Sequence, residues 1–242
     1  MIDRNYVLQS LSGPDRAVLE PFFQRVNLAA GDVLHEPGYP VEWVHFPNTA
    51  VVSVVTVMAD GRTVESDTVG YESAVGALSV LGSTLAVTRT FTQIAGSAIR
   101  IPAGRIRQRA DVSADLRRLL IRHANANLAQ AHQSVACNAL HALTERLCRW
   151  LLMSQDRTAD DRIRLTQQYL ATMLGVQRTS VNEALQDLTV SGLIRQERGA
   201  ILILDRPRIE ALACECYEVV RTNLEQLIGR EPFADPAIGV TP

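Results

Sequence analysis

The first hundred residues alternate short apolar runs with residues typical of turns. The turn signals are Gly31-Asp32, Pro37-Gly38, Asp60-Gly61 and Gly70. Between them lie β-branched segments, of which residues 51–57 (VVSVVTV) are the clearest. Short strands separated in this way predict a small barrel or sandwich that ends near residue 103. We expect a short helix before it, with Ser12 as its N-cap and Pro14 in its first turn.

Residues 111–135 contain neither glycine nor proline, and their apolar positions recur every three or four residues. This spacing predicts a long helix with an apolar seam, whose alanines allow a second helix to approach closely. The seam consists of Ile121, Ala124, Leu128, Ala131 and Val135. A second face carries Leu116, Leu120, His123, Asn127 and Gln130. We interpret the helix as a dimerisation helix that also touches the barrel. The alternative is an amphipathic helix packed wholly within one chain.

Residues 138–153 continue as helix, and a polar break follows. Residues 165–188 (LTQQYLATMLGVQRTSVNEALQDL) then have the pattern of a helix-turn-helix. Thr166 can cap the first helix, Gly175 can form the turn, and the second helix has a buried stripe. That stripe is Val181, Ala184, Leu185 and Leu188. The exposed start of the second helix carries polar side chains of the types that reach base edges in a major groove. These are Gln177, Arg178, Ser180 and Asn182.

Two short strands around Gly199 follow the second helix and predict a wing. Arg195 and Arg198 lie where such a wing would meet phosphates. Residues 162–208 hold seven arginines against four acidic residues, a local charge of +3 in a chain whose formal charge is −2. The overall charge therefore excludes a generally basic nucleic-acid coat, and the local charge favours DNA binding by this segment. A winged helix used only for protein contact is the alternative.

The composition, with 47% hydrophobic and 21% charged residues, is that of a folded globular chain. All four cysteines, Cys137, Cys148, Cys214 and Cys216, lie in the second half, and so few in so long a chain favour the reducing cytoplasm. The N-terminal residues lack a signal peptide, and the most apolar stretch, residues 50–58, is too short to cross a membrane. We therefore expect a cytoplasmic protein without a membrane partner.

The order and spacing of these parts resemble the Crp/Fnr family of bacterial transcription regulators over nearly the whole chain. The resemblance rests on the glycine-punctuated first part, the long helix, the helix-turn-helix of residues 165–194 and the wing of residues 195–204. It implies an α+β fold, in which a cyclic-nucleotide-binding-type β-roll is followed by a dimerisation helix and a winged helix-turn-helix. It also implies a homodimer that reads a palindromic DNA site near promoters and contacts RNA polymerase.

The expected domains are a β-roll sensor at residues 1–110, the dimerisation helix at 111–136, the winged helix-turn-helix at 137–229 and a flexible tail at 230–242. Arg178 matches the guanine-reading arginine of the family. Thr179 stands where many members have a glutamate, and Glu183 where the cyclic AMP receptor has a second arginine, so the half-site should differ from the common consensus. The expected DNA contacts are Thr166, Gln167, Gln177, Arg178, Thr179, Ser180, Asn182, Glu183, Arg195 and Arg198.

The cyclic nucleotide motif of the family is degenerate in this sequence. Gly70-Tyr71-Glu72 approximates its first element, but Arg89-Thr90-Phe91 lies too far downstream and lacks the alanine. We therefore do not expect cyclic nucleotide binding, although Gly70, Glu72, Arg89 and Asn127 remain the candidates for an effector pocket. No cysteine precedes Cys137, so we also exclude the iron–sulfur cluster that the oxygen-sensing branch holds near its N-terminus.

No metal site is expected. Asp205 is a candidate N-cap and Pro207 lies in the first turn of a last helix that we expect to run to about Ile228. Cys214 and Cys216 would lie on this helix, where residues two apart point to different sides, so the pair alone cannot chelate a metal. The histidines have no mutual spacing typical of metal ligands. Neither a nucleophile with its base nor a metal cluster is found, so the sequence predicts no enzyme and no cofactor. The predicted function is a DNA-binding regulator that either responds to an unknown signal or is constitutively active. The rival prediction is a small-molecule sensor whose winged helix contacts a protein.

Overall fold

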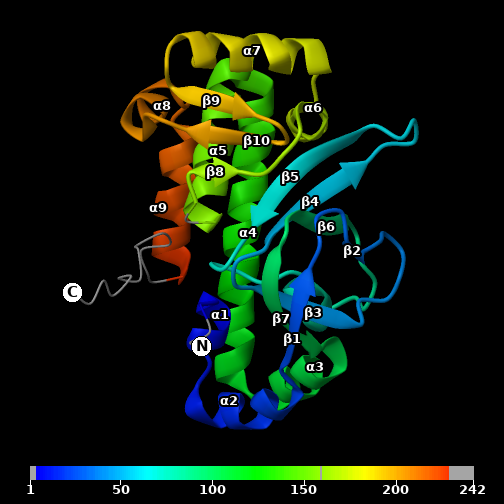
Figure 1. Ribbon diagram of the computed structural model, residues 1–242. Coiled ribbons are helices and arrows are strands. Elements are labelled where there is room, and N and C mark those ends of the chain that lie inside the picture. The colour runs from blue at the N-terminus through cyan, green and yellow to red at the C-terminus, as the bar shows by residue number, and fades with distance from the viewer. Residues whose placement is uncertain (1–3, 159, 229–242) are drawn as a thin grey trace, which may run out of the picture.

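The computed structural model describes residues 4–158 and 160–228. The chain has an α+β fold in which a β-roll and a C-terminal helical domain lie along one long helix (Figure 1). Short helices come first: α1 (Tyr6–Gln9), α2 (Gly13–Leu19) and η1 (Glu20–Phe22). The predicted cap of α2 is confirmed, because the Ser12 hydroxyl accepts a hydrogen bond from the Asp15 backbone N–H at 3.2 Å.

The β-roll consists of two antiparallel sheets, as the alternation of apolar runs and turns predicts. One sheet has the order β1-β7-β3 and the other β2-β6-β4-β5. The strands are β1 (Gln24–Leu28), β2 (Val33–His35), β3 (Trp43–Pro47), β4 (Val51–Val57), β5 (Thr63–Val69), β6 (Arg89–Ile94) and β7 (Gly96–Pro102), with a short helix η2 (Ala77–Val80) before β6. The predicted β-branched strand is β4, and its Val51 and Val52 are fully buried.

Two helices follow the roll, α3 (Ala103–Val112) and α4 (Ala114–Leu140), where the sequence predicts one helix that starts at residue 111. Ser113 separates the two helices. It has an extended backbone, with φ −111° and ψ 108°, and its hydroxyl accepts a hydrogen bond from Leu116 N–H, which caps α4. At its other end α4 runs to Leu140, beyond the predicted boundary. His141 is extended, so α5 (Leu143–Thr158) begins as a separate helix.

The C-terminal domain is built around α5. Its further elements are β8 (Arg162–Ile163), α6 (Gln167–Leu174), α7 (Arg178–Val190), β9 (Ile194–Glu197), β10 (Ala200–Ile203), α8 (Arg206–Leu212) and α9 (Cys216–Ile228), with the sheet order β8-β10-β9. Its core contains buried side chains from α5, α6, α7 and the wing, among them Leu147, Leu151, Leu170, Leu185 and Ile201. The predicted helix-turn-helix and wing are therefore confirmed as structural elements.

The last segment of the chain differs from the prediction of one helix over residues 205–228. Ala213 is extended, with φ −70° and ψ 148°, and it separates α8 from α9. This break places Cys214 before α9 instead of within a helix. The predicted tail of residues 230–242 lies outside the described residues. Within the described part of the chain, no helix is both long and apolar enough to span a bilayer.

The two domains contact each other directly through α6 and the β4–β5 hairpin. The turn between α6 and α7 touches β5 so closely that a Cβ on Gly175 would lie 2.7 Å from Val64 Cγ2. A buried hydrogen bond also crosses between the two domains. Trp150 Nε1 of α5 donates to Glu65 Oε2 of β5 at 2.9 Å. These contacts fix where α7 lies relative to the roll.

Candidate nucleic-acid interface

The helix-turn-helix has the geometry that its sequence predicts. Thr166 Oγ1 accepts a hydrogen bond from Tyr169 N–H at 3.2 Å and caps α6. Gly175 has φ +66°, a left-handed backbone conformation that glycine adopts without steric strain, and it ends α6. Gln177 is extended and precedes the first residue of α7. The turn is therefore tight enough for α7 to pack across α6.

The buried and exposed faces of α7 also follow the prediction. Val181, Ala184, Leu185 and Leu188 are buried in the domain core. The candidate base-contacting residues lie at the start of the helix and on its outer face, and all are exposed except the half-buried Ser180. They are Gln177, Arg178, Thr179, Ser180, Asn182 and Glu183. In Figure 1, α7 forms the end of the molecule opposite α2 and α3, so nothing in the described chain covers this face.

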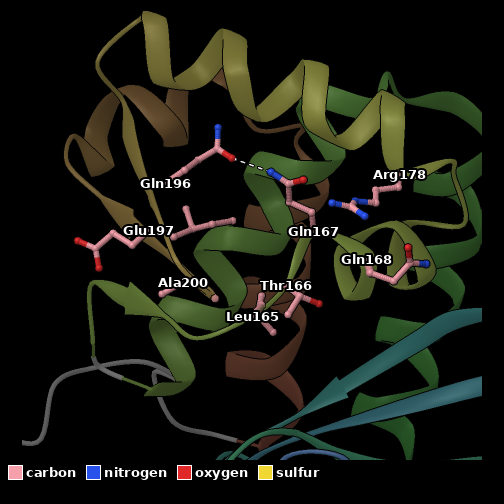
Figure 2. A pocket seen from close by; sticks show the side chains of 10 residues that line it. Leu165, Thr166, Gln167, Gln168, Arg178, Gln196, Glu197 and Ala200 are labelled. Atoms are coloured by element: carbon pink, nitrogen blue, oxygen red, sulfur yellow. Dashed lines mark hydrogen bonds between the residues drawn. The ribbon is translucent and has the colours of Figure 1, made fainter.

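A groove of about 470 Å³ lies between the start of α6, the start of α7 and the wing (Figure 2). Gln167 is at its centre. The Gln167 amide donates to Gln196 Oε1 at 2.9 Å and to Asn182 Oδ1 at 3.2 Å. The Gln196 amide in turn donates to Thr189 Oγ1 at 3.2 Å. This chain of amides connects the wing to both helices and orients Asn182, a candidate base contact.

Gln168 and Gln196 line the groove but were not among the predicted contacts. Gln196 comes from β9, between the two wing arginines in sequence. A strand alternates its faces, so the half-buried Gln196 points toward α6 while Arg195 faces solvent. The alternation of side chains along this strand could have identified Gln196 from the sequence as a residue that faces the groove.

The wing is a hairpin in which Glu197 pairs with Ala200, leaving Arg198-Gly199 as a two-residue loop. Gly199 has φ +73°, which suits such a turn. Arg198 is exposed at the tip. Arg195 is exposed as well, but Glu197 Oε1 lies 3.5 Å from its guanidinium.

The local positive charge is therefore less concentrated on this surface than a count along the sequence indicates. Glu197 is shared, because its other oxygen pairs with Arg162 at 3.0 Å. Arg206 points away from the groove: its guanidinium pairs with Asp156 and Glu210 at 2.8 Å. Within the described residues, no carboxylate forms an ion pair with Arg178 or Arg198, so these two exposed arginines are well placed to meet an anionic ligand.

Comparison with known proteins assigns this segment. The sequence model of the Crp-like helix-turn-helix domain matches residues 145–212, which extend from α5 to the end of α8. The segment is a Crp-like helix-turn-helix domain. No curated protein matches the chain in sequence. The assignment of residues 145–212 thus rests on their sequence pattern and on their helix-turn-helix geometry.

Solved regulators share the fold over most of this chain. A Crp/Fnr-family regulator from Eubacterium rectale superimposes with a TM-score of 0.69 at 16% identity, over 87% of this chain and 99% of that one. FixK2 from Bradyrhizobium japonicum has a TM-score of 0.68 at 18% identity, over 79% and 98%. A CRP/FNR-family regulator from Thermus thermophilus has 0.63 at 21%, over 78% and 98%. The resemblance to the Crp/Fnr family and the predicted fold class are confirmed.

The candidate effector residues lie in different surroundings. Glu72 is buried next to the Crp-like domain, where its Oε1 accepts from Gly70 N–H and from Arg157 Nε, each at 2.9 Å. Arg89 pairs with Glu36 at 3.2 Å near the surface. Asn127, on α4, accepts a hydrogen bond from the Ser73 hydroxyl at 2.8 Å. The structure brings Gly70 and Glu72 together, but it does not bring the four candidates into one site.

Asn127 lines a cavity of about 270 Å³ between the roll and α4. Most of the lining is apolar, contributed by valines of the roll and by Leu128 of α4. His35 and His123 lie in the same wall. Burial lowers the pKa of His35, whose Nε2 lies 3.0 Å from the carbonyl oxygen of Trp43. The cavity therefore combines an apolar lining with a few polar groups, as ligand pockets do.

The expectation that the chain has no metal site and no cofactor is wrong. One ligand atom each of Cys137, His141, Cys214 and Cys216 lies within 4.8 Å of all the others, so these residues can hold a metal ion. A continuous last helix would have kept Cys214 and Cys216 apart, but the break at Ala213 turns both toward the end of α4. The absence of N-terminal cysteines, on which the exclusion of an iron–sulfur cluster was based, has no bearing on this group.

Proposed function

We propose that the protein is a homodimeric regulator that reads a palindromic DNA site with α7. The observation that carries this proposal is the exposed start of α7, where Gln177, Arg178 and Asn182 project from a packed helix-turn-helix beside the wing. A recognition helix contacts base edges with its N-terminal residues while the wing and the first helix meet the backbone. The exposed start of α7 and its position beside the wing support this proposal.

Each exposed side chain has a role that its chemistry suits. Arg178 would donate two hydrogen bonds to a guanine, and Asn182 or Gln177 would pair with an adenine. The Gln167 amide holds Asn182 in place and leaves its NH₂ group for a base. Thr179 and Glu183 differ from the family pattern, so we propose a half-site distinct from the common consensus. Arg198 at the wing tip would contact phosphate.

The proposed dimer interface is the seam of α4. Ile121, Leu128 and Val135 are exposed apolar side chains at every seventh position, while Ala124 and Ala131 lie between them with little or partial exposure. An uncovered heptad stripe of this kind is the pattern of a two-helix coiled coil. Two copies joined along α4 would present two α7 helices to successive major grooves.

We propose that a signal reaches α7 through the cavity or α4, or that the dimer is constitutively active. To change occupancy from 1:99 to 99:1, an effector must prefer one state by roughly 5.5 kcal/mol. Contact with RNA polymerase stays a prediction. The rival, a sensor whose winged helix contacts a protein, predicts that variants on α7 leave DNA affinity unchanged. An enzyme is not favoured, because the matching sequence model describes a helix-turn-helix domain.

The test is selection of random DNA duplexes by the purified, ligand-free protein, followed by sequencing. We expect a two-fold symmetric motif whose half-sites lie about one helical turn apart. On the selected site, Arg178→Ala should cost about 1–3 kcal/mol and relax specificity at one position. The control is Arg105→Ala, which removes an exposed arginine from α3 at the opposite end of the molecule. Equal affinities of wild type and Arg178→Ala would contradict the proposal.

A further inference from the structure

The group of Cys137, His141, Cys214 and Cys216 joins two parts of the fold that are far apart in sequence. Cys137 lies in the last turn of α4, and His141 is the residue that ends it. Cys214 precedes α9, and Cys216 is its first residue. The three cysteines are buried against one another, and His141 is partly buried at the rim. Four soft or borderline ligands thus converge from the two helices.

Two distances within the group are close to those between ligands of one tetrahedral ion, and all the ligand atoms lie within 4.8 Å of one another. Cys137 Sγ lies 3.5 Å from Cys214 Sγ, and Cys216 Sγ lies 3.5 Å from His141 Nδ1. With Zn–S near 2.3 Å and Zn–N near 2.0 Å, a tetrahedron has edges of about 3.8 Å between sulfurs and about 3.6 Å between sulfur and nitrogen. The ligands of an iron–sulfur cluster bind different irons and lie farther apart. The spacing therefore fits a mononuclear ion.

Neighbouring side chains complete the surroundings that such an ion needs. His141 Nε2, the nitrogen that faces away from the group, lies 3.1 Å from Glu215 Oε2. A carboxylate at this position fixes the histidine tautomer in which Nδ1 is free to bind a metal. The Gln133 amide lies 3.0 Å from Cys216 Sγ and donates to it. Both contacts orient ligands and do not serve the groove at α7.

Thiolate is the form of cysteine that binds metals, and positive charges lie beside this group. The guanidinium of Arg149, a buried side chain, interacts electrostatically with Cys137. Arg146 is also buried nearby and interacts with Cys137. Two buried cations therefore balance a site that becomes anionic when thiolates surround a divalent ion.

We propose that Cys137, His141, Cys214 and Cys216 bind one Zn²⁺ ion that fastens the end of α4 to the start of α9. Three thiolates and one imidazole form a closed set without an open position, which is typical of structural zinc. A redox role for Cys137 and Cys214 would instead require these two sulfurs to form a disulfide. His141, which Glu215 orients, serves as a ligand in the zinc site, whereas a disulfide would give it no role.

The consequence for regulation rests on the proposed function. Only His141 and Ala142 separate α4 from α5, so this is where the Crp-like domain can change its angle to α4. Zinc would tie His141 to the start of α9, which packs along α4. The ion would therefore hold α7 in one placement relative to the dimer axis.

The test measures metal binding without DNA. Reduced protein is loaded with Zn²⁺, passed over a desalting column and assayed for zinc, and in parallel titrated with Co²⁺. We expect one zinc per chain and, with Co²⁺, the thiolate charge-transfer and visible bands of a tetrahedral site. Cys214→Ser and His141→Ala should lose the zinc and the bands. Cys148→Ala, the matched control at the cysteine outside the group, should keep both.

A milder variant keeps the test independent of folding. Glu215 is exposed, so Glu215→Gln should leave the fold intact while weakening zinc binding about 10- to 100-fold by competition with a chelating dye. Wild-type protein without the Co²⁺ bands would overturn the proposal. So would zinc retained equally by Cys214→Ser, or a Cys137–Cys214 disulfide that zinc does not prevent.

Regulation is tested separately with the selected DNA site. Removal of zinc by a chelator should weaken DNA binding of the wild type, and added Zn²⁺ should restore it. In Glu215→Gln, restoration should need more zinc. If the protein binds zinc with the expected spectrum but selects no DNA, the proposed function fails and the metal site stands. If it binds DNA equally with and without zinc, the regulatory consequence fails alone.

Discussion

The buried ion pair between Arg157 and Glu72 should be the most sensitive link between the Crp-like domain and the roll. The side chains are 0% and 2% exposed, and Arg157 Nε donates to Glu72 Oε1 at 2.9 Å. The same guanidinium donates to the Met153 carbonyl oxygen at 3.0 Å and to Gln130 Oε1 at 3.2 Å. These partners come from α4, α5 and the roll, so Arg157 joins all three. We therefore perturb the ion pair by removing the charge of Glu72 or that of Arg157, one at a time.

Glu72→Gln keeps the shape of the side chain but leaves the guanidinium without its counter-charge. Removing one partner of a buried pair costs about 3–5 kcal/mol, because the remaining charge stays desolvated. Arg157→Met leaves the carboxylate instead, and it also removes a positive charge that lowers the pKa of Asp67, which burial raises. For a chain of this size, we expect each single variant to lower Tm by roughly 10 °C.

The double variant decides whether the pair acts as a unit. With both charges of the pair gone, neither member is left as a charge without its partner, so the double variant should lose less stability than the sum of the two single variants. Urea unfolding followed by fluorescence suits this chain, because Trp43 reports on the roll and Trp150 on α5. If the single losses add to within about 0.5 kcal/mol, the side chains do not couple and the reasoning is refuted.

Three further predictions concern other surfaces. Glu197→Gln should strengthen binding to all DNA sequences and steepen the salt dependence by about one charge, because Arg195 loses its partner; an unchanged slope of log K against log salt would contradict this. Leu128→Glu should dissociate the proposed dimer in analytical ultracentrifugation. Val190→Glu, which alters an exposed apolar side chain outside the seam, should not. Asp67→Asn should raise Tm at pH 8 but not near pH 3.5. Burial raises the pKa of Asp67 well above 3.8, so the wild-type carboxyl destabilises the fold increasingly as pH rises above that value. A gain in Tm that does not depend on pH would contradict the raised pKa of Asp67.

The sequence predicts the parts of the fold that local patterns determine. The strand at residues 51–57, the cap at Ser12 and the turn at Gly175 each depend on residues adjacent in the chain, and all are confirmed. Three helix breaks were missed, at Ser113, at His141 and at Ala213. None of these residues is a glycine or a proline, yet each is extended where one packed helix ends and the next begins. Such turns are set by tertiary contacts, which periodicity does not record.

The same distinction separates the two candidate sites. The candidate base-contacting residues of α7 lie within one segment, and their exposure follows from the helical period, so a sequence pattern is sufficient to find them. The candidate metal ligands come from segments more than seventy residues apart: Cys137 and Cys214 are separated by 77 positions. Their spacing has no motif, and their convergence depends on the packing of α9 against α4.

The long helix α4 connects the cavity, the exposed apolar seam and the Cys137 group. His123 and Asn127 line the cavity, Leu128 belongs to the exposed seam, and Cys137 lies in the metal-ligand group at its end. From residue 127 to residue 141 a helix spans about 20 Å and is stiff over that length, so a displacement at the cavity must appear at His141. If zinc ties His141 to α9, that displacement moves α9 and α7 together; without zinc, the break after α4 can absorb it. A ligand in the cavity should therefore change DNA affinity more in the zinc-loaded protein than in the zinc-free protein.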